Sequence, residues 1–158
     1  MRTLFSDSEE STRRLAAMIS GNLSEPVTIL LEGDLGAGKT HFAQGFAQGL
    51  GVSETISSPT FALLNRYPLP DRPASELLHF DLYRLEDPYL EWELLGFEEL
   101  VEGSNFCLVE WPLRIAEFWS AKTPKIEILR VSDHVRKLLI PAELLSGIDT
   151  AEWQGCDN

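Results

Sequence analysis

The chain has 158 residues, of which 44% are hydrophobic, and carries 25 acidic side chains against 13 lysines and arginines. Its length predicts a single domain over residues 1–158, and its apolar content argues against a disordered chain because it is sufficient for a core. The formal charge of −12 argues against a large surface that grips a nucleic-acid backbone, which would need clustered Lys and Arg.

The first predicted element is an amphipathic helix near the N-terminus. Residues 6–9, Ser-Asp-Ser-Glu, have the pattern of a capping box, and Leu15, Met18 and Ile19 follow on one helical face. The segment before this helix lacks the apolar run of a signal peptide, and no stretch reaches the roughly 18 apolar residues of a membrane span. We therefore expect a cytoplasmic protein without membrane association.

A glycine-rich turn joins a strand predicted over residues 27–31 to a helix predicted over residues 39–50, which ends at Gly51. The turn matches the motif G-x-x-x-x-G-K-[ST] at every position, and its residues are Gly33, Asp34, Leu35, Gly36, Ala37, Gly38, Lys39 and Thr40. Glycines let successive backbone N–H groups point inward and bind an anion, and the helix N-terminus adds partial positive charge. The motif predicts a nucleoside triphosphate site in which Lys39 reaches the β- and γ-phosphates and Thr40 binds Mg²⁺.

The second half of the chain alternates strands and helices. Strands are predicted over residues 60–67, 77–83 and 105–111, and Asp87-Pro88 begins a helix that ends at Gly96. This alternation predicts an α/β fold, the three-layer P-loop NTPase fold, with a mainly parallel central sheet.

The C-terminal part predicts a hairpin and a tail. Residues 125–132 and 134–141 read as two antiparallel strands added at an edge of the sheet. We expect a short helix from Ala142 and a frayed tail over residues 151–158.

Two acids are candidates to complete the phosphate site. Asp81 and Glu110 each follow a predicted strand, and the carboxyl ends of parallel strands gather at the edge of the sheet where ligands bind. A P-loop needs such a carboxylate near Mg²⁺. Spacing leaves open which of the two contacts the metal directly. His79 shares a strand face with Asp81, and it is either hydrogen-bonded to a site acid or an ordinary strand-end histidine.

Hydroxyl and aromatic side chains give weaker signals. Ser58-Pro59-Thr60 is either a loop that senses the γ-phosphate or a simple turn before a strand. Tyr83 could contact that loop or only pack. The larger aromatic side chains predict core or partner-interface packing, because no basic residues interleave them; they are Trp92, Phe97, Phe106, Phe118 and Trp119.

Several features are missing from the sequence. Cys107 and Cys156 fit no metal-binding spacing, which predicts reduced thiols. No N-K-x-D segment is present to read guanine, and no arginine-rich lid of a small-molecule kinase stands out. The chain offers no evident arginine finger, so we expect slow turnover by the isolated protein and a partner that completes the site.

The assembled motifs resemble the bacterial TsaE family, which acts in the synthesis of N6-threonylcarbamoyladenosine in tRNA. The matching segments are collinear over residues 30–112 and read LEGDLGAGKT, SSPTFALLNRY, LHFDLYRLED, LGFEEL and CLVEWP. The glycine motif alone is unspecific, whereas H-x-D-L-Y-R together with V-E-W is diagnostic of this family. Residue 41 departs from the pattern, being His where a second Thr is common.

This resemblance implies roles for particular residues. Residues 33–40 would bind ATP, with Thr40 also on Mg²⁺, and Thr60 would be a switch-like threonine. Asp81 and Glu110 would be the acids around Mg²⁺ and the attacking water. The start of the N-terminal helix, Glu9 to Thr12, would lie near the nucleotide base. The resemblance leaves the roles of Trp111 and Arg84 open.

The resemblance further implies an ATPase whose hydrolysis supports the TsaB–TsaD complex, which transfers threonylcarbamoyl to adenosine 37 of ANN-decoding tRNAs. The acidic charge agrees with a protein that serves this modification without gripping tRNA itself. Two alternatives remain. One is a small-metabolite kinase with Asp81 or Glu110 as the base, and the other is a regulatory module whose nucleotide-bound state carries the signal.

Overall fold

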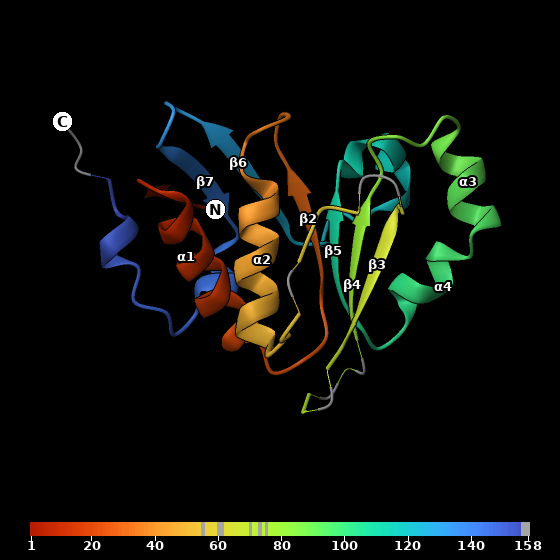
Figure 1. The fold of residues 1–158 in the computed structure, drawn as a ribbon, viewed down its shortest axis with the longest axis horizontal. Helices are drawn as coiled ribbons and strands as arrows, with labels where there is room; N and C mark the ends of the chain where they lie inside the picture. Colours follow the sequence, from red (N-terminus) through yellow and green to blue (C-terminus); the bar gives the residue numbers. More distant parts are fainter. Residues whose placement is uncertain (55, 60–61, 70, 73, 75, 156–158) are drawn as a thin grey trace.

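The structure is a computed structural model that describes residues 1–54, 56–59, 62–69, 71, 72, 74 and 76–155 (Figure 1). Its strands are β1 (Arg2–Ser6), β2 (Thr28–Glu32), β3 (Leu64–Pro68), β4 (Glu76–Asp81), β5 (Phe106–Glu110), β6 (Lys125–Arg130) and β7 (Arg136–Ile140). Its α-helices are α1 (Glu9–Gly21), α2 (Lys39–Leu50), α3 (Pro88–Leu94) and α4 (Phe97–Glu102), and its 3-10 helices are η1 (Pro112–Phe118), η2 (Ala142–Leu145) and η3 (Ala151–Trp153).

The strands form one sheet in the order β1-β7-β6-β2-β5-β4-β3. The four central strands, β6, β2, β5 and β4, are parallel, and every pairing outside them is antiparallel. The predicted three-layer α/β fold with a mainly parallel centre and antiparallel edges is therefore confirmed. The predicted hairpin is also present, but it is not the edge, because β6 pairs with β2 and β1 covers β7.

Helices cover both faces of this sheet (Figure 1). On one face, α1 and α2 bury residues such as Leu15, Ile19 and Phe46 against the sheet. On the other face, α3, α4 and η1 bury a smaller cluster that includes Trp92, Phe97 and Ile115. The predicted packing role of Trp92 and Phe97 is confirmed, since both are buried in this cluster.

The two long helices approach each other through glycines of α2. A Cβ at Gly45 would lie 2.1 Å from the backbone oxygen of Arg13, and a Cβ at Gly49 would lie 2.1 Å from Ser20 Oγ. Only hydrogen atoms fit at these two positions, so α1 and α2 pack almost backbone to backbone. This contact fixes the position of α2, whose first residue is Lys39.

The N-terminal segment differs from the sequence-based expectation. Residues 2–6 form β1, and Ser8, not Ser6, is the N-cap of α1, with its Oγ accepting from the Ser11 N–H. Met18 is exposed instead of sharing the buried face. The capping pattern was placed two residues early because Ser6 pairs with Arg136 in the sheet, a long-range contact that a local pattern does not contain.

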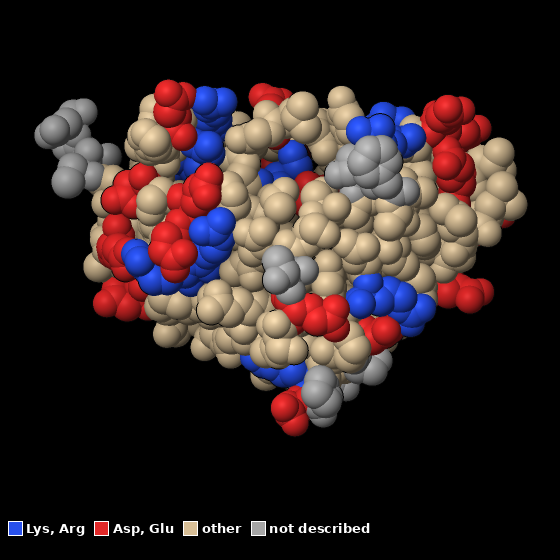
Figure 2. All heavy atoms as spheres, viewed as in Figure 1, with Lys and Arg blue, Asp and Glu red and all other residues tan. Residues whose placement is uncertain are grey.

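The C-terminal segment also differs in part. Trp153 in η3 is buried, and its Nε1 donates to Ser11 Oγ over 3.0 Å. The first residues of the expected frayed tail therefore pack on α1, because a large aromatic side chain gains more by burial than by exposure. Cys156 lies outside the described residues. No helix in the described part of the chain is long and apolar enough to cross a membrane. On the face that Figure 2 shows, Lys and Arg side chains are interspersed with Asp and Glu side chains.

Candidate functional site

The glycine turn between β2 and α2 has the backbone of an anion-binding loop. Gly33, Gly36 and Gly38 have φ values of 153°, 76° and 108°, which side-chain-bearing residues rarely adopt. Gly33 is also sterically required, because a Cβ there would lie 2.5 Å from the oxygen of Ile128 on β6. No side chain caps the N-terminus of α2, so its first N–H groups remain available to an anion.

Lys39 is drawn into the loop. Its side chain is buried, and Nζ donates to Gly33 O over 2.7 Å and to Asp34 O over 3.0 Å. The ammonium also lies 4.3 Å from the ring centroid of Trp111, within the range of a cation–π interaction. Burial lowers the pKa of Lys39, while the charges of Glu110, Asp81 and Asp34 oppose that shift.

The two candidate acids are neighbours in the sheet. Asp81 and Glu110 are the last residues of β4 and β5 and are directly paired across these parallel strands. Asp81 is held at both oxygens: Ser58 Oγ donates to Oδ2 over 3.0 Å, and the Tyr83 N–H donates to Oδ1 over 3.0 Å. The two acids, predicted from separate motifs, therefore lie side by side at the carboxyl ends of β4 and β5.

Glu110 is held differently, by His79. His79 Nε2 lies 2.9 Å from Glu110 Oε1, and both side chains are buried. Of the two interpretations of His79 left open by the sequence, the structure selects the hydrogen bond to a site acid. The signal was the two-residue strand period that puts His79 and Asp81 on one face.

These side chains line one open pocket of about 640 Å³. The predicted site residues on its wall are Leu35, Gly36, Gly38, Lys39, Thr40, Ser58, Asp81 and Glu110. Three predicted loop residues are not on this wall: Gly33 and Asp34 line a hollow on the other side of Trp111, and Ala37 is buried. Thr60 lies outside the described residues, so its predicted role stays a prediction.

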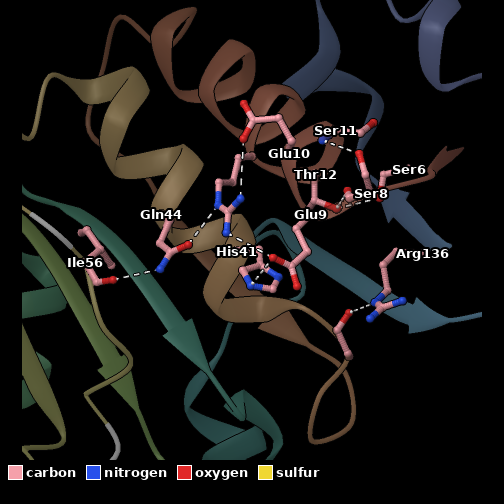
Figure 3. A network of polar contacts seen from close by, with 12 residues as sticks. Ser6, Ser8, Glu9, Glu10, Ser11, Thr12, His41, Gln44, Ile56 and Arg136 are labelled. Carbon is pink, nitrogen blue, oxygen red and sulfur yellow. Dashed lines mark hydrogen bonds and ion pairs between the residues drawn. The ribbon is translucent and has the colours of Figure 1, made fainter. Parts of the chain in front are cut away.

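A smaller hollow of about 230 Å³ adjoins the pocket and shares Gly38 and His41 with it. Figure 3 shows Glu9, Thr12, His41 and Arg136 from its wall. Glu9 and Thr12, the residues expected near the nucleotide base, line this hollow. Glu9 Oε2 lies 3.3 Å from His41 Nε2, and burial lowers the pKa of His41. Thr12 is buried with its hydroxyl 2.6 Å from Ser6 Oγ, so that hydroxyl already has a protein partner.

Three residues to which the motifs gave no role, Arg136, Trp111 and Arg84, also lie at the pocket or the adjoining hollow. Arg136 on β7 donates from Nε to Ala37 O over 2.8 Å and so connects the hairpin to the glycine loop (Figure 3). Nothing in the sequence pointed to Arg136, because this contact joins residues 99 positions apart. Trp111, with a φ of 59°, packs against Tyr83 with tilted rings whose centroids are 4.8 Å apart, and Arg84 lines the pocket. Among the described residues, Arg84 is therefore the arginine on the pocket wall.

The donor set fits a magnesium ion held jointly with a nucleotide. No group of three or more His, Cys, Asp or Glu side chains within the described residues could hold a metal ion by itself. Mg²⁺ in phosphate sites takes one or two protein oxygens and completes its shell with phosphate and water. Thr40, Asp81 and Glu110 on one pocket wall supply oxygens of this kind.

Comparisons with known proteins give a consistent result. The family model described as "Threonylcarbamoyl adenosine biosynthesis protein TsaE" matches residues 6–138. The chain belongs to the TsaE family. The tRNA threonylcarbamoyladenosine biosynthesis protein TsaE of Bacillus subtilis (strain 168) is 39% identical, over 84% of this chain and 80% of the length of that protein. TsaE from a Nostoc species is 48% identical, over 78% of this chain and 71% of the length of that protein.

A solved structure agrees with the TsaE assignment. The crystal structure of Bacillus subtilis YdiB matches with a TM-score of 0.72 and 30% identity, over 92% of this chain and 89% of that chain. The P-loop NTPase fold expected from the sequence is confirmed by this likeness. TsaE proteins are named for tRNA threonylcarbamoyladenosine biosynthesis, and this chain has its place in that process.

Proposed function

We propose that this chain is an ATPase that binds Mg·ATP, and that its hydrolysis supports the TsaB–TsaD complex in threonylcarbamoylation of adenosine 37 in ANN-decoding tRNAs. One observation carries the ATPase part: Lys39, Asp81 and Glu110 converge on one pocket beside a glycine loop and an uncapped helix N-terminus. The family assignment supports the tRNA part, and the TsaB–TsaD complex follows from the resemblance of the motifs.

The residues of the pocket have separable tasks in this proposal. Backbone N–H groups of the loop and the N-terminus of α2 bind the phosphates, and Lys39 donates to the β- and γ-phosphates. Thr40 and an acid would hold Mg²⁺, which neutralises charge that develops on the transferred phosphoryl group. Glu110 or Asp81 orients the attacking water. The Trp111 ring, whose centroid lies 4.3 Å from the Lys39 ammonium, favours the charged form of Lys39 through a cation–π interaction.

The binding test compares two lysine variants by calorimetric titration with Mg·ATP. Lys39→Ala should lose detectable affinity for Mg·ATP, because it removes the buried ammonium that is proposed to donate to the phosphates. Lys122→Ala, which removes an exposed lysine, should bind like the wild type. Undiminished binding by Lys39→Ala contradicts the proposed phosphate site.

The coupling test is single-turnover hydrolysis of ATP with and without purified TsaB–TsaD complex. We expect slow hydrolysis by the isolated chain, stimulation by the complex, and loss of turnover without loss of ATP binding in Glu110→Gln. An unstimulated rate contradicts the coupling, and transfer of labelled phosphate to an acceptor other than water indicates a kinase instead. A Glu110→Gln variant that still supports tRNA modification indicates the regulatory module.

A further inference from the structure

His79 is a buried titratable side chain to which neither the motif nor the proposed mechanism gives a task. It lies on β4, paired with Asn65 of β3 on one side and with Leu108 of β5 on the other, and none of its surface is exposed. A histidine in such a place loses the hydration of two ring nitrogens. Its contacts should therefore explain why it is there.

One ring nitrogen of His79 has a partner and the other does not. Nε2 lies 2.9 Å from Glu110 Oε1, whereas Nδ1 makes no hydrogen bond to any described residue. Because a carboxylate only accepts, the proton of this bond is on Nε2. The imidazole is thus oriented by a single bond, and that bond ends on the acid of the pocket.

The two pocket acids differ in how many neighbours hold them. Both Asp81 oxygens accept hydrogen bonds, from Ser58 and from the backbone of Tyr83. The hydrogen bond from His79 to Oε1 is the one the described residues make to the Glu110 carboxylate, whose side chain reaches the pocket wall. A glutamate side chain has three rotatable bonds, so without His79 its carboxylate would sample several orientations.

We propose that His79 is a positioning residue for Glu110: its Nε2–H holds Oε1 at the sheet and leaves Oε2 for the pocket. The inference rests on the proposed ATPase function and assigns a task within that site. It requires a hydrogen-bond donor at the Nε2 position and no transfer of a proton to or from His79. Mutation of a residue that hydrogen-bonds a metal ligand typically lowers activity about 10–100-fold, and we expect a loss of that size when His79 is replaced.

Two amide variants separate this role from packing. The side-chain nitrogen of His79→Gln can stand where Nε2 stands, whereas the shorter side chain of His79→Asn places its nitrogen near Nδ1, out of reach of Glu110. We expect His79→Asn to lower kcat for ATP about 10–100-fold with KM unchanged. His79→Gln should recover most of that loss. Equal activity of the two variants, or a loss that appears in KM alone, overturns the positioning role.

A double-mutant cycle tests whether the effect passes through Glu110. In a Glu110→Asp background, which keeps a carboxylate but withdraws it from Nε2 by one methylene, His79→Asn should cause little further loss of single-turnover rate. Additive losses overturn the inference. A wild-type protein that binds Mg·ATP and never hydrolyses it overturns the proposed function, whereas an active wild type with an equally active His79→Asn overturns only the role of His79.

A measurement on the folded wild type covers the case in which His79→Asn does not fold. Long-range ¹⁵N–¹H spectra of the histidine rings should show a proton on Nε2 of His79, assigned by the loss of its signals in His79→Gln. A ring protonated at Nδ1 alone contradicts the donor geometry and overturns the proposal.

Discussion

The two faces of the central sheet have different chemistry. The face covered by α1 and α2 carries buried polar side chains, among them Lys39, His79, Asp81 and Glu110. None of the buried polar side chains in the described residues belongs to α3, α4 or η1, whose face is filled by an aromatic cluster around Trp92. One face therefore carries the chemistry, and the other supports the same strands from behind.

The two faces differ because successive side chains of a strand point to opposite sides of the sheet. Asp81 and Glu110 point to the α1/α2 face, while their neighbours Phe80 and Val109 point into the aromatic cluster. Dry packing at Phe80 and Val109 holds the strand ends rigid at the positions where the acids emerge. Buried polar groups in turn need partners, and Ser58 and His79 are partners of the two acids.

Substitutions on the aromatic face should affect the free energy of unfolding more than they affect nucleotide binding. The ring of Trp92 lies 5.5 Å from that of Phe80 and 5.1 Å from that of Phe118, measured between centroids. Trp92→Ala should therefore lower the free energy of unfolding by about 3–5 kcal/mol, measured by urea denaturation. Mg·ATP affinity measured below the melting transition should stay unchanged. A large loss of affinity in the folded variant contradicts the division between the faces.

The α1/α2 face should couple stability to binding. Gly45→Ala places a Cβ against the backbone of Arg13 and should cost about 2–3 kcal/mol, because backbone atoms cannot move aside cheaply. It should also weaken Mg·ATP binding, since α1 and α2 carry the two sides of the smaller hollow. The control is Gly21→Ala, whose Cβ would lie 3.7 Å from Gly49 O in ordinary contact, and which should fold and bind normally.

The dryness of the aromatic face can be measured through Cys107 on β5. Burial raises the pKa of this thiol to about 11 from 9.0. Between these values the unfolded thiol has lost its proton while the folded one keeps it, so stability falls as pH rises from 9 to 11. This fall should amount to about 2 kcal/mol and should be absent in Cys107→Ala, measured by denaturation at each pH. Identical pH profiles contradict a dry cluster.

A smaller effect is expected from the contact that holds Asp81. Ser58→Ala removes one donor to a charged carboxylate, worth about 1.5 kcal/mol, which corresponds to about a tenfold lower kcat for ATP hydrolysis. Stability should change little, because Ser58 lies at the open pocket. Ser57→Ala alters an exposed neighbouring side chain and should be indistinguishable from the wild type.

Local sequence patterns predicted most of the residues that line the candidate site. The glycine motif placed Lys39 at the start of α2, and the strand ends placed Asp81 and Glu110 on one edge. Such patterns succeed because loop conformation and strand alternation depend on neighbouring residues. The same reasoning missed β1 and misplaced the cap of α1, since Ser6 is held in the sheet by Arg136.

The amino-acid sequence by itself determined the family, the fold class and the glycine loop, because each depends on residue types at short, fixed spacing. Only the tertiary structure decided that His79 holds Glu110, that Ser58 holds Asp81, and that Arg136 closes on the loop. These contacts join residues between 23 and 99 positions apart. Their distances depend on how the strands are ordered in the sheet, which no local pattern specifies.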